Sequence, residues 1–93
     1  MKMIVLTSTN KFIVVTDSIK QQVYGYLDLA HDYIREATAK QCARVMMRAP
    51  YDGSVRELVI DTLIKDNYKI QIVKPEDNST LVMTNYDTLI IEW

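Results

Sequence analysis

The sequence predicts one small α+β domain, built as a single antiparallel sheet with helices on one of its faces. The chain has 93 residues, which is enough for one hydrophobic core and no second domain. Its apolar and charged fractions, 48% and 25%, are those of a folded globular protein. Short β-branched segments lie near both ends, with helical periodicity between them. Strands, then helices, then strands are typical of an antiparallel sheet that carries its helices on one side.

The first two segments predict a β-hairpin. Residues 2–6 and 12–15 are rich in β-branched residues, and the polar stretch between them has the composition of a turn. Both faces of this hairpin are apolar, with Met3, Val5, Ile13 and Val15 on one side and Ile4, Leu6, Phe12 and Val14 on the other. We therefore expect both faces to be covered, one by helices and the other by a second subunit.

The next segment predicts a long amphipathic helix. Ser18 and Gln21 have the spacing of a capping box. An apolar stripe follows at steps of three and four residues: Ile19, Val23, Leu27, Ala30, Ile34 and Ala37. Tyr26 and Tyr33 widen this stripe, so they are expected beside the core.

Residues 38–49 leave three interpretations open, because the apolar stripe loses its phase beyond Ala37. The helix kinks near residues 38–41, a second helix follows, or residues 44–49 form a strand. We favour a helix, since alanine, glutamine, arginine and methionine are good helix formers. Pro50 ends the element in each case.

The second half predicts one helix and a three-stranded meander. Ser54 and Glu57 form a second capping box, and Asn67 suits the left-handed position after a helix end. The apolar residues of this helix are Val55, Leu58, Val59 and Leu63. The expected strands lie at 68–73, 80–84 and 88–93.

Composition and charge exclude several classes of protein. The single cysteine, Cys42, cannot form an internal disulfide, so we expect a reducing, cytoplasmic setting and a buried, unreactive thiol. The apolar run 3–6 is too short for a signal peptide or a membrane span, so no membrane partner is expected. The net charge of −1 excludes a globally basic nucleic-acid binder. The charge is nevertheless uneven, at +3 over residues 1–50 and −4 over residues 51–93.

Catalytic, cofactor and metal sites are not expected. Asp28, His31 and Asp32 lie within one helical turn, but this spacing is also that of a solvated helix face with charge pairs, which is the interpretation we favour. The only histidine is eleven positions from Cys42, and the sequence has no glycine-rich phosphate loop. We therefore expect a protein that is not an enzyme.

Two sets of residues are candidates for binding a partner. Lys40, Arg44 and Arg48 would form a basic row on a helix, with Arg35 nearby, and such a row can follow phosphates while Tyr51 stacks on a base. Tyr24, Tyr51 and Tyr86 fall outside the core stripes, and tyrosine is enriched at protein interfaces.

The function expected from these observations is binding to another protein. Small size, few catalytic groups, uneven charge and many tyrosines are shared by small accessory and inhibitory proteins of phages and plasmids. By this analogy we expect an inhibitor that binds and blocks a host factor. We also expect a homodimer that a charge at Val5 or Ile90 would disrupt. The alternative is a small nucleic-acid-binding regulator that uses the basic row.

Overall fold

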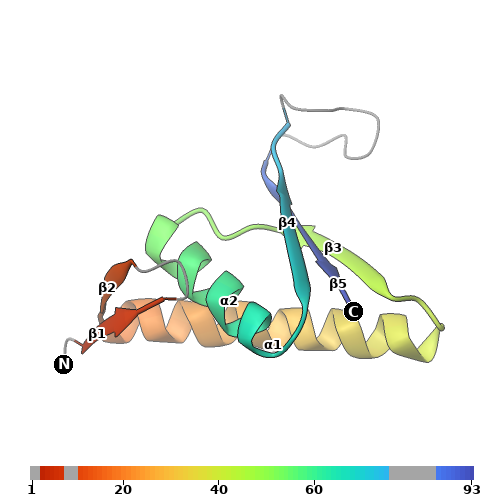
Figure 1. Ribbon diagram of the computed structural model, residues 1–93, viewed down its shortest axis with the longest axis horizontal. Coiled ribbons are helices and arrows are strands. Elements are labelled where there is room, and N and C mark those ends of the chain that lie inside the picture. The colour runs from red at the N-terminus through yellow and green to blue at the C-terminus, as the bar shows by residue number, and fades with distance from the viewer. Residues whose placement is uncertain (1–2, 8–10, 76–85) are drawn as a thin grey trace.

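The computed structural model describes residues 3–7, 11–75 and 86–93, and this part of the chain contains two helices and two antiparallel sheets (Figure 1). In chain order the elements are β1 (Met3–Leu6), β2 (Phe12–Val15), α1 (Asp17–Ala39), β3 (Arg44–Arg48), α2 (Gly53–Lys65), β4 (Lys69–Val73) and β5 (Thr88–Glu92). The predicted α+β class is confirmed.

The prediction of one continuous sheet is wrong, and the length of α1 is the reason. This helix has 23 residues and is therefore ~34 Å long, close to the 40 Å long axis of the molecule. Only Thr16 separates β2 from α1, so the hairpin stays at the first end of the helix. The three-stranded sheet begins after the helix and covers its other end, and α2 lies between the two sheets (Figure 1).

The hairpin has the predicted strands and the predicted division of its faces. The strands pair in register, with Ile4 opposite Val14 and Leu6 opposite Phe12. Ile13 and Val15 on the other face are buried in the core. Residues 8–10, most of the expected turn, lie outside the described residues.

The stripe predicted on α1 is confirmed, whereas its predicted cap is wrong. Val23, Ala30 and Ile34 are buried, and Ile19, Leu27 and Ala37 are half-buried. The N-cap is Thr16, whose Oγ1 accepts a hydrogen bond from the Ile19 amide at 3.2 Å. Thr16 caps the helix because its backbone is extended, while Ser18 already lies inside the first turn.

Residues 44–48 form strand β3, so our preference for a helix is wrong. Helix α1 ends at Ala39, and Gln41 takes a left-handed conformation with φ of 60° that turns the chain. The strand then pairs with β5 over its full length, from Arg44 opposite Glu92 to Arg48 opposite Thr88. Differences in helix propensity amount to roughly a few tenths of a kcal/mol per residue, and pairing with a neighbouring strand overrides them.

The second sheet has the strand order β3-β5-β4. Because β5 is antiparallel to both neighbours, β3 and β4 run parallel and α2 connects them, which is a split β-α-β arrangement. The expected strand 80–84 lies outside the described residues, and β4 pairs directly with β5. The helices cover one face of this sheet, where Met47, Leu89 and Ile91 are buried.

Helix α2 is capped by Asp52, not by the predicted Ser54. Asp52 Oδ1 accepts hydrogen bonds from the amides of Ser54 and Val55 at 2.9 and 3.1 Å. At the other end Asn67 has the predicted left-handed conformation, with φ of 72°.

The cap gives a prediction with a matched control in the same turn. Asp52→Ala should lower the free energy of unfolding by about 1 kcal/mol, because two amides lose their acceptor. Ser54→Ala should change it by less than about 0.5 kcal/mol. Urea denaturation followed by circular dichroism measures both values. A larger loss of unfolding free energy for Ser54→Ala than for Asp52→Ala would mean that Ser54 is the cap, as predicted from the sequence.

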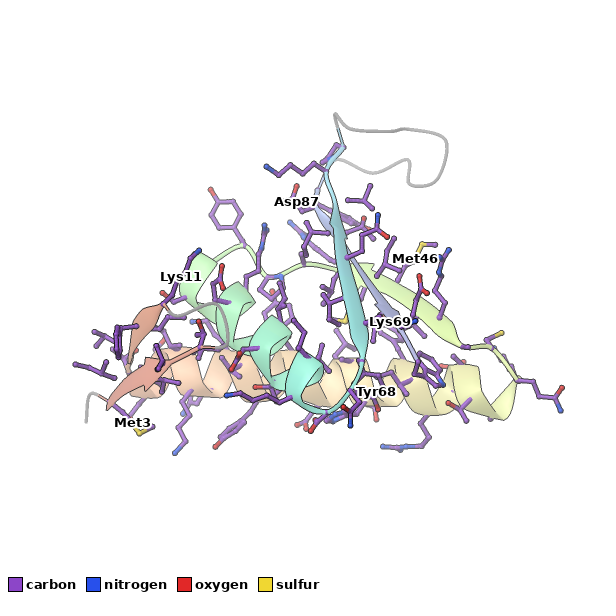
Figure 2. All side chains as sticks on the ribbon, viewed as in Figure 1. Met3, Lys11, Met46, Tyr68, Lys69 and Asp87 are labelled. Carbon is purple, nitrogen blue, oxygen red and sulfur yellow. The ribbon has the colours of Figure 1, made fainter. Side chains whose placement is uncertain are left out.

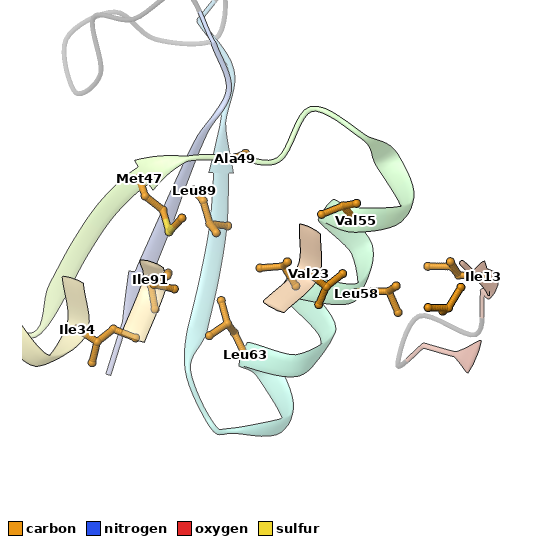
Figure 3. Packing of buried hydrophobic residues seen from close by; sticks show 13 residues of the cluster. Ile13, Val23, Ile34, Met47, Ala49, Val55, Leu58, Leu63, Leu89 and Ile91 are labelled. Carbon is orange, nitrogen blue, oxygen red and sulfur yellow. The ribbon is translucent and has the colours of Figure 1, made fainter. Parts of the chain in front are cut away.

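One hydrophobic core joins both sheets to the helices (Figure 3). At the hairpin end, Ile13 lies beside Leu58 of α2. At the other end, Ile34 and Leu63 join Leu89 and Ile91 of β5. The hairpin is therefore docked onto the helices by its inner side chains.

Candidate functional site

The outer face of the hairpin is an exposed apolar surface. Ile4, Leu6, Phe12 and Val14, which we call the hairpin face, are 67%, 49%, 72% and 48% exposed. Cross-strand pairing holds them in a two-by-two array. Carbon-only side chains project outward beside β1 and β2 at the left of Figure 2. A contiguous apolar patch of roughly several hundred Å² is the kind that marks an interaction site on a protein surface.

The inner face fixes the hairpin face in position. Ile13 and Val15 are buried and Val5 is half-buried against the core. Lys11, next to β2, forms an ion pair of 3.2 Å with Glu57 of α2. Since an isolated two-stranded hairpin is only marginally stable in water, this docking is what presents the outer side chains in a fixed array.

The strands of the hairpin lack two of the usual devices against strand association. Residues 3–6 and 12–15 contain no charged residue and no proline. Within the described residues, each strand pairs only with the other, so each has one edge without a strand partner. Charges, prolines, bulges and very short strands are the usual devices that limit strand association. Charges and prolines are absent from these two strands, which are each four residues long.

The outer face of the three-stranded sheet is different, because polar side chains surround its apolar centre. Ile90 does face away from Leu89 and Ile91, as expected, but it is only 2% exposed between Met46 and Gln71. Arg44 and Glu92 pair across this face at 2.7 Å.

The two positions expected to disrupt a dimer both lie within the packing of the monomer. Ile90 is buried among its neighbours on the outer face, and Val5 packs against the core on the inner side of the hairpin. A charge at either position would act on the fold of the monomer rather than on an exposed face.

The basic row predicted on a helix does not exist as one helical face. Lys40 caps the end of α1 and pairs with Glu36 at 3.4 Å. Arg44 and Arg48 lie on β3, four residues apart on the outer face, and Arg44 pairs with Glu92. Arg35 is exposed on α1 and pairs with Asp32 at 3.3 Å.

The predicted tyrosines are all exposed, and two of them share a pocket with Arg48. Tyr24 lies on α1 beside Lys20, whose Nζ is 5.8 Å from the ring centroid.

A second candidate surface, after the hairpin face, is a pocket that we call the arginine–tyrosine pocket. It has a volume of about 410 Å³ and is lined by Arg48, Ala49, Tyr51, Arg56, Tyr86 and Asp87. Arg56 was not among the binding residues predicted from the sequence, because its hydrogen-bond partners, Pro50 and Asp87, lie in two other segments.

Cys42 is exposed, so the expectation of a buried thiol is wrong. It follows the left-handed Gln41 in the turn after α1, and its Sγ lies 3.8 Å from the carbonyl oxygen of Lys40. The chain leaves the helix there, which takes Cys42 off the apolar stripe.

This exposure predicts rapid labelling of the native protein. A thiol reagent should modify Cys42 at a rate within a few-fold of that in denaturant, since access does not require unfolding. A Cys42→Ser variant serves as the blank. Native labelling that is slower by several orders of magnitude would contradict the exposed position.

Asp28, His31 and Asp32 are exposed on α1, as expected for a solvated helix face. Among the residues that the structure describes, no group of three or more histidine, cysteine, aspartate or glutamate side chains could hold a metal ion. Neither described helix is long and apolar enough to cross a membrane.

Comparison with known proteins gave no match. No family model matches the sequence, and no curated protein or solved structure matches it significantly.

Proposed function

We propose that this protein is a non-enzymatic protein-binding module that forms a homodimer through the hairpin face. The observation that carries the proposal is the contiguous exposure of Ile4, Leu6, Phe12 and Val14 on a hairpin docked by its other side. A second copy presents the same uncharged face, so a twofold pair brings apolar side chains together without opposing like charges.

Packing of face against face is favoured over pairing of strand edges. Joining two hairpins at their edges would form one wider sheet and leave both hairpin faces in water. Packing the faces together removes them from water, at the ~10 Å separation usual between stacked sheets. The hydrophobic effect therefore favours the face-to-face arrangement.

The size of the hairpin face sets the expected strength of the dimer. Two copies would bury roughly 600–1,000 Å² in total, below the ~1,200 Å² at which stable interfaces begin. Such an interface is weak and reversible. We therefore propose a dimer that dissociates in the micromolar range.

Nucleic-acid binding through Lys40, Arg44 and Arg48 is less well supported. Two of these three cations already pair with glutamates, and the three do not form one row. The sequence led us to expect an inhibitor that blocks a surface of another protein, and the proposed module is compatible with that role.

Sedimentation velocity over a range of micromolar concentrations tests the proposal. We expect the weight-average sedimentation coefficient to rise from that of a 10.8 kDa monomer to that of a dimer, and to change little with salt. A coefficient that stays at the monomer value at the highest concentration would overturn the homodimer.

A further inference from the structure

The arginine–tyrosine pocket lies where residues 48–56 meet residues 86–87, two stretches that are distant in the sequence. Arg48 ends β3, Tyr51 follows in the loop, Arg56 lies in the first turns of α2, and Tyr86 and Asp87 precede β5. Pairing of β3 with β5 brings the first and last of these together. The volume of about 410 Å³ is in the range of small-ligand sites.

Arg56 is held rigidly at one side of this pocket. Its Nε donates to the carbonyl oxygen of Pro50 at 2.9 Å, and its Nη1 donates to Asp87 Oδ2 at 2.9 Å. Both members of the ion pair are three-quarters buried. The N–H groups of Nη2 take part in neither bond. A guanidinium fixed in this way loses little conformational freedom when it binds an anion.

Arg48 provides a second guanidinium. It lies over the Tyr86 ring, with Cζ 5.0 Å from the centroid, and this contact orients it without neutralising it. In residues 3–7, 11–75 and 86–93 no carboxylate lies within ion-pair distance of Arg48. With two arginines and one aspartate, the pocket has a net charge of +1.

The Tyr51 ring completes the site at its rim. This side chain is 94% exposed, although it follows the buried Pro50 in the loop before α2. An exposed aromatic ring beside a cationic pocket offers a surface on which a planar group can stack.

We propose that the arginine–tyrosine pocket binds an oxyanion, a carboxylate or a phosphate group, on a ligand with a planar ring that stacks on Tyr51. The planar guanidinium forms paired hydrogen bonds with both kinds of oxyanion, which explains why two arginines line the pocket. This inference does not depend on the proposed homodimer, because the hairpin face contributes no residue to the pocket.

Nuclear magnetic resonance titration tests the site with simple probes. The backbone amide and arginine Nε–Hε signals are followed while sodium phosphate, acetate, phenyl phosphate or benzoate replaces sodium chloride at constant ionic strength. We expect saturable shifts at Arg48, Arg56 and Tyr51. We also expect tighter binding of the phenyl-bearing probe than of its parent ion. The tighter of the phosphate and carboxylate series identifies the oxyanion.

Four variants separate the site from general charge effects. Arg48→Ala should weaken binding at least fivefold, and Arg48→Lys should fail to restore it fully because an ammonium lacks the planar fork. Arg35→Ala removes the same charge from α1 and should leave binding unchanged. Shifts that do not saturate, or that are equal for the Arg48→Ala and Arg35→Ala proteins, would overturn the proposal. Tyr51→Ala should weaken only the phenyl-bearing probes.

Discussion

Replacing Ile34 with aspartate should unfold the protein. This side chain belongs to the α1 stripe, is only 8% exposed, and packs in the core that joins the helix to β5 (Figure 3). An unpaired carboxylate there costs several kcal/mol, and a domain of this size has about 5–15 kcal/mol of stability in total. The loss of cooperative unfolding in urea, followed by circular dichroism, measures the effect.

Asp32→Ala on the same helix is the matched control. Asp32 is exposed and forms one exposed ion pair with Arg35, at 3.3 Å. Exposed pairs contribute little, so the free energy of unfolding should change by less than about 0.5 kcal/mol. A loss as large as that for Ile34→Asp would mean that the two faces of α1 are assigned the wrong way round.

Replacing Phe12 with lysine should weaken self-association at least tenfold while the monomer stays folded. Phe12 is the most exposed member of the hairpin face, so its removal costs little within one copy. In the proposed dimer two such rings leave water, and each lysine would instead bring a charge into the apolar contact. The dissociation constant from sedimentation velocity measures the change.

Leu29→Lys provides the control for this experiment. Leu29 is also an exposed apolar residue, but it lies on α1 outside the hairpin face. The same chemical change should therefore leave the dissociation constant within about twofold. Equal weakening by both variants would indicate a general effect of charge and would refute the hairpin face as the contact surface.

The elements with clear periodicity were predictable from the sequence, and those fixed by tertiary pairing were not. The stripe from Ile19 to Ala37 reports the buried side of α1 directly, because one face of a helix recurs every three or four residues. Residues 44–48 carry good helix formers, and only pairing with β5 makes them a strand. That pairing joins residues forty to forty-eight positions apart in the sequence, which local propensity cannot reveal.

The candidate sites were likewise predictable only in part. Alternation in the hairpin separates Ile4 and Phe12 from Ile13, but which face the helices cover depends on where α1 and α2 lie. The exposure of Tyr51 and Tyr86 followed from their position outside the stripes. The role of Arg56 did not, because the Pro50 carbonyl and Asp87 meet it only in the folded chain.

Nuclear Overhauser effects between copies test whether two copies meet through the hairpin face. A mixture of isotope-labelled and unlabelled protein is measured at a concentration where sedimentation shows the dimer. We expect contacts between the Phe12 ring of one copy and the methyl groups of Ile4, Leu6 or Val14 of the other. Intermolecular contacts confined to Met46 and the outer face of the three-stranded sheet, or none at any concentration, would contradict it.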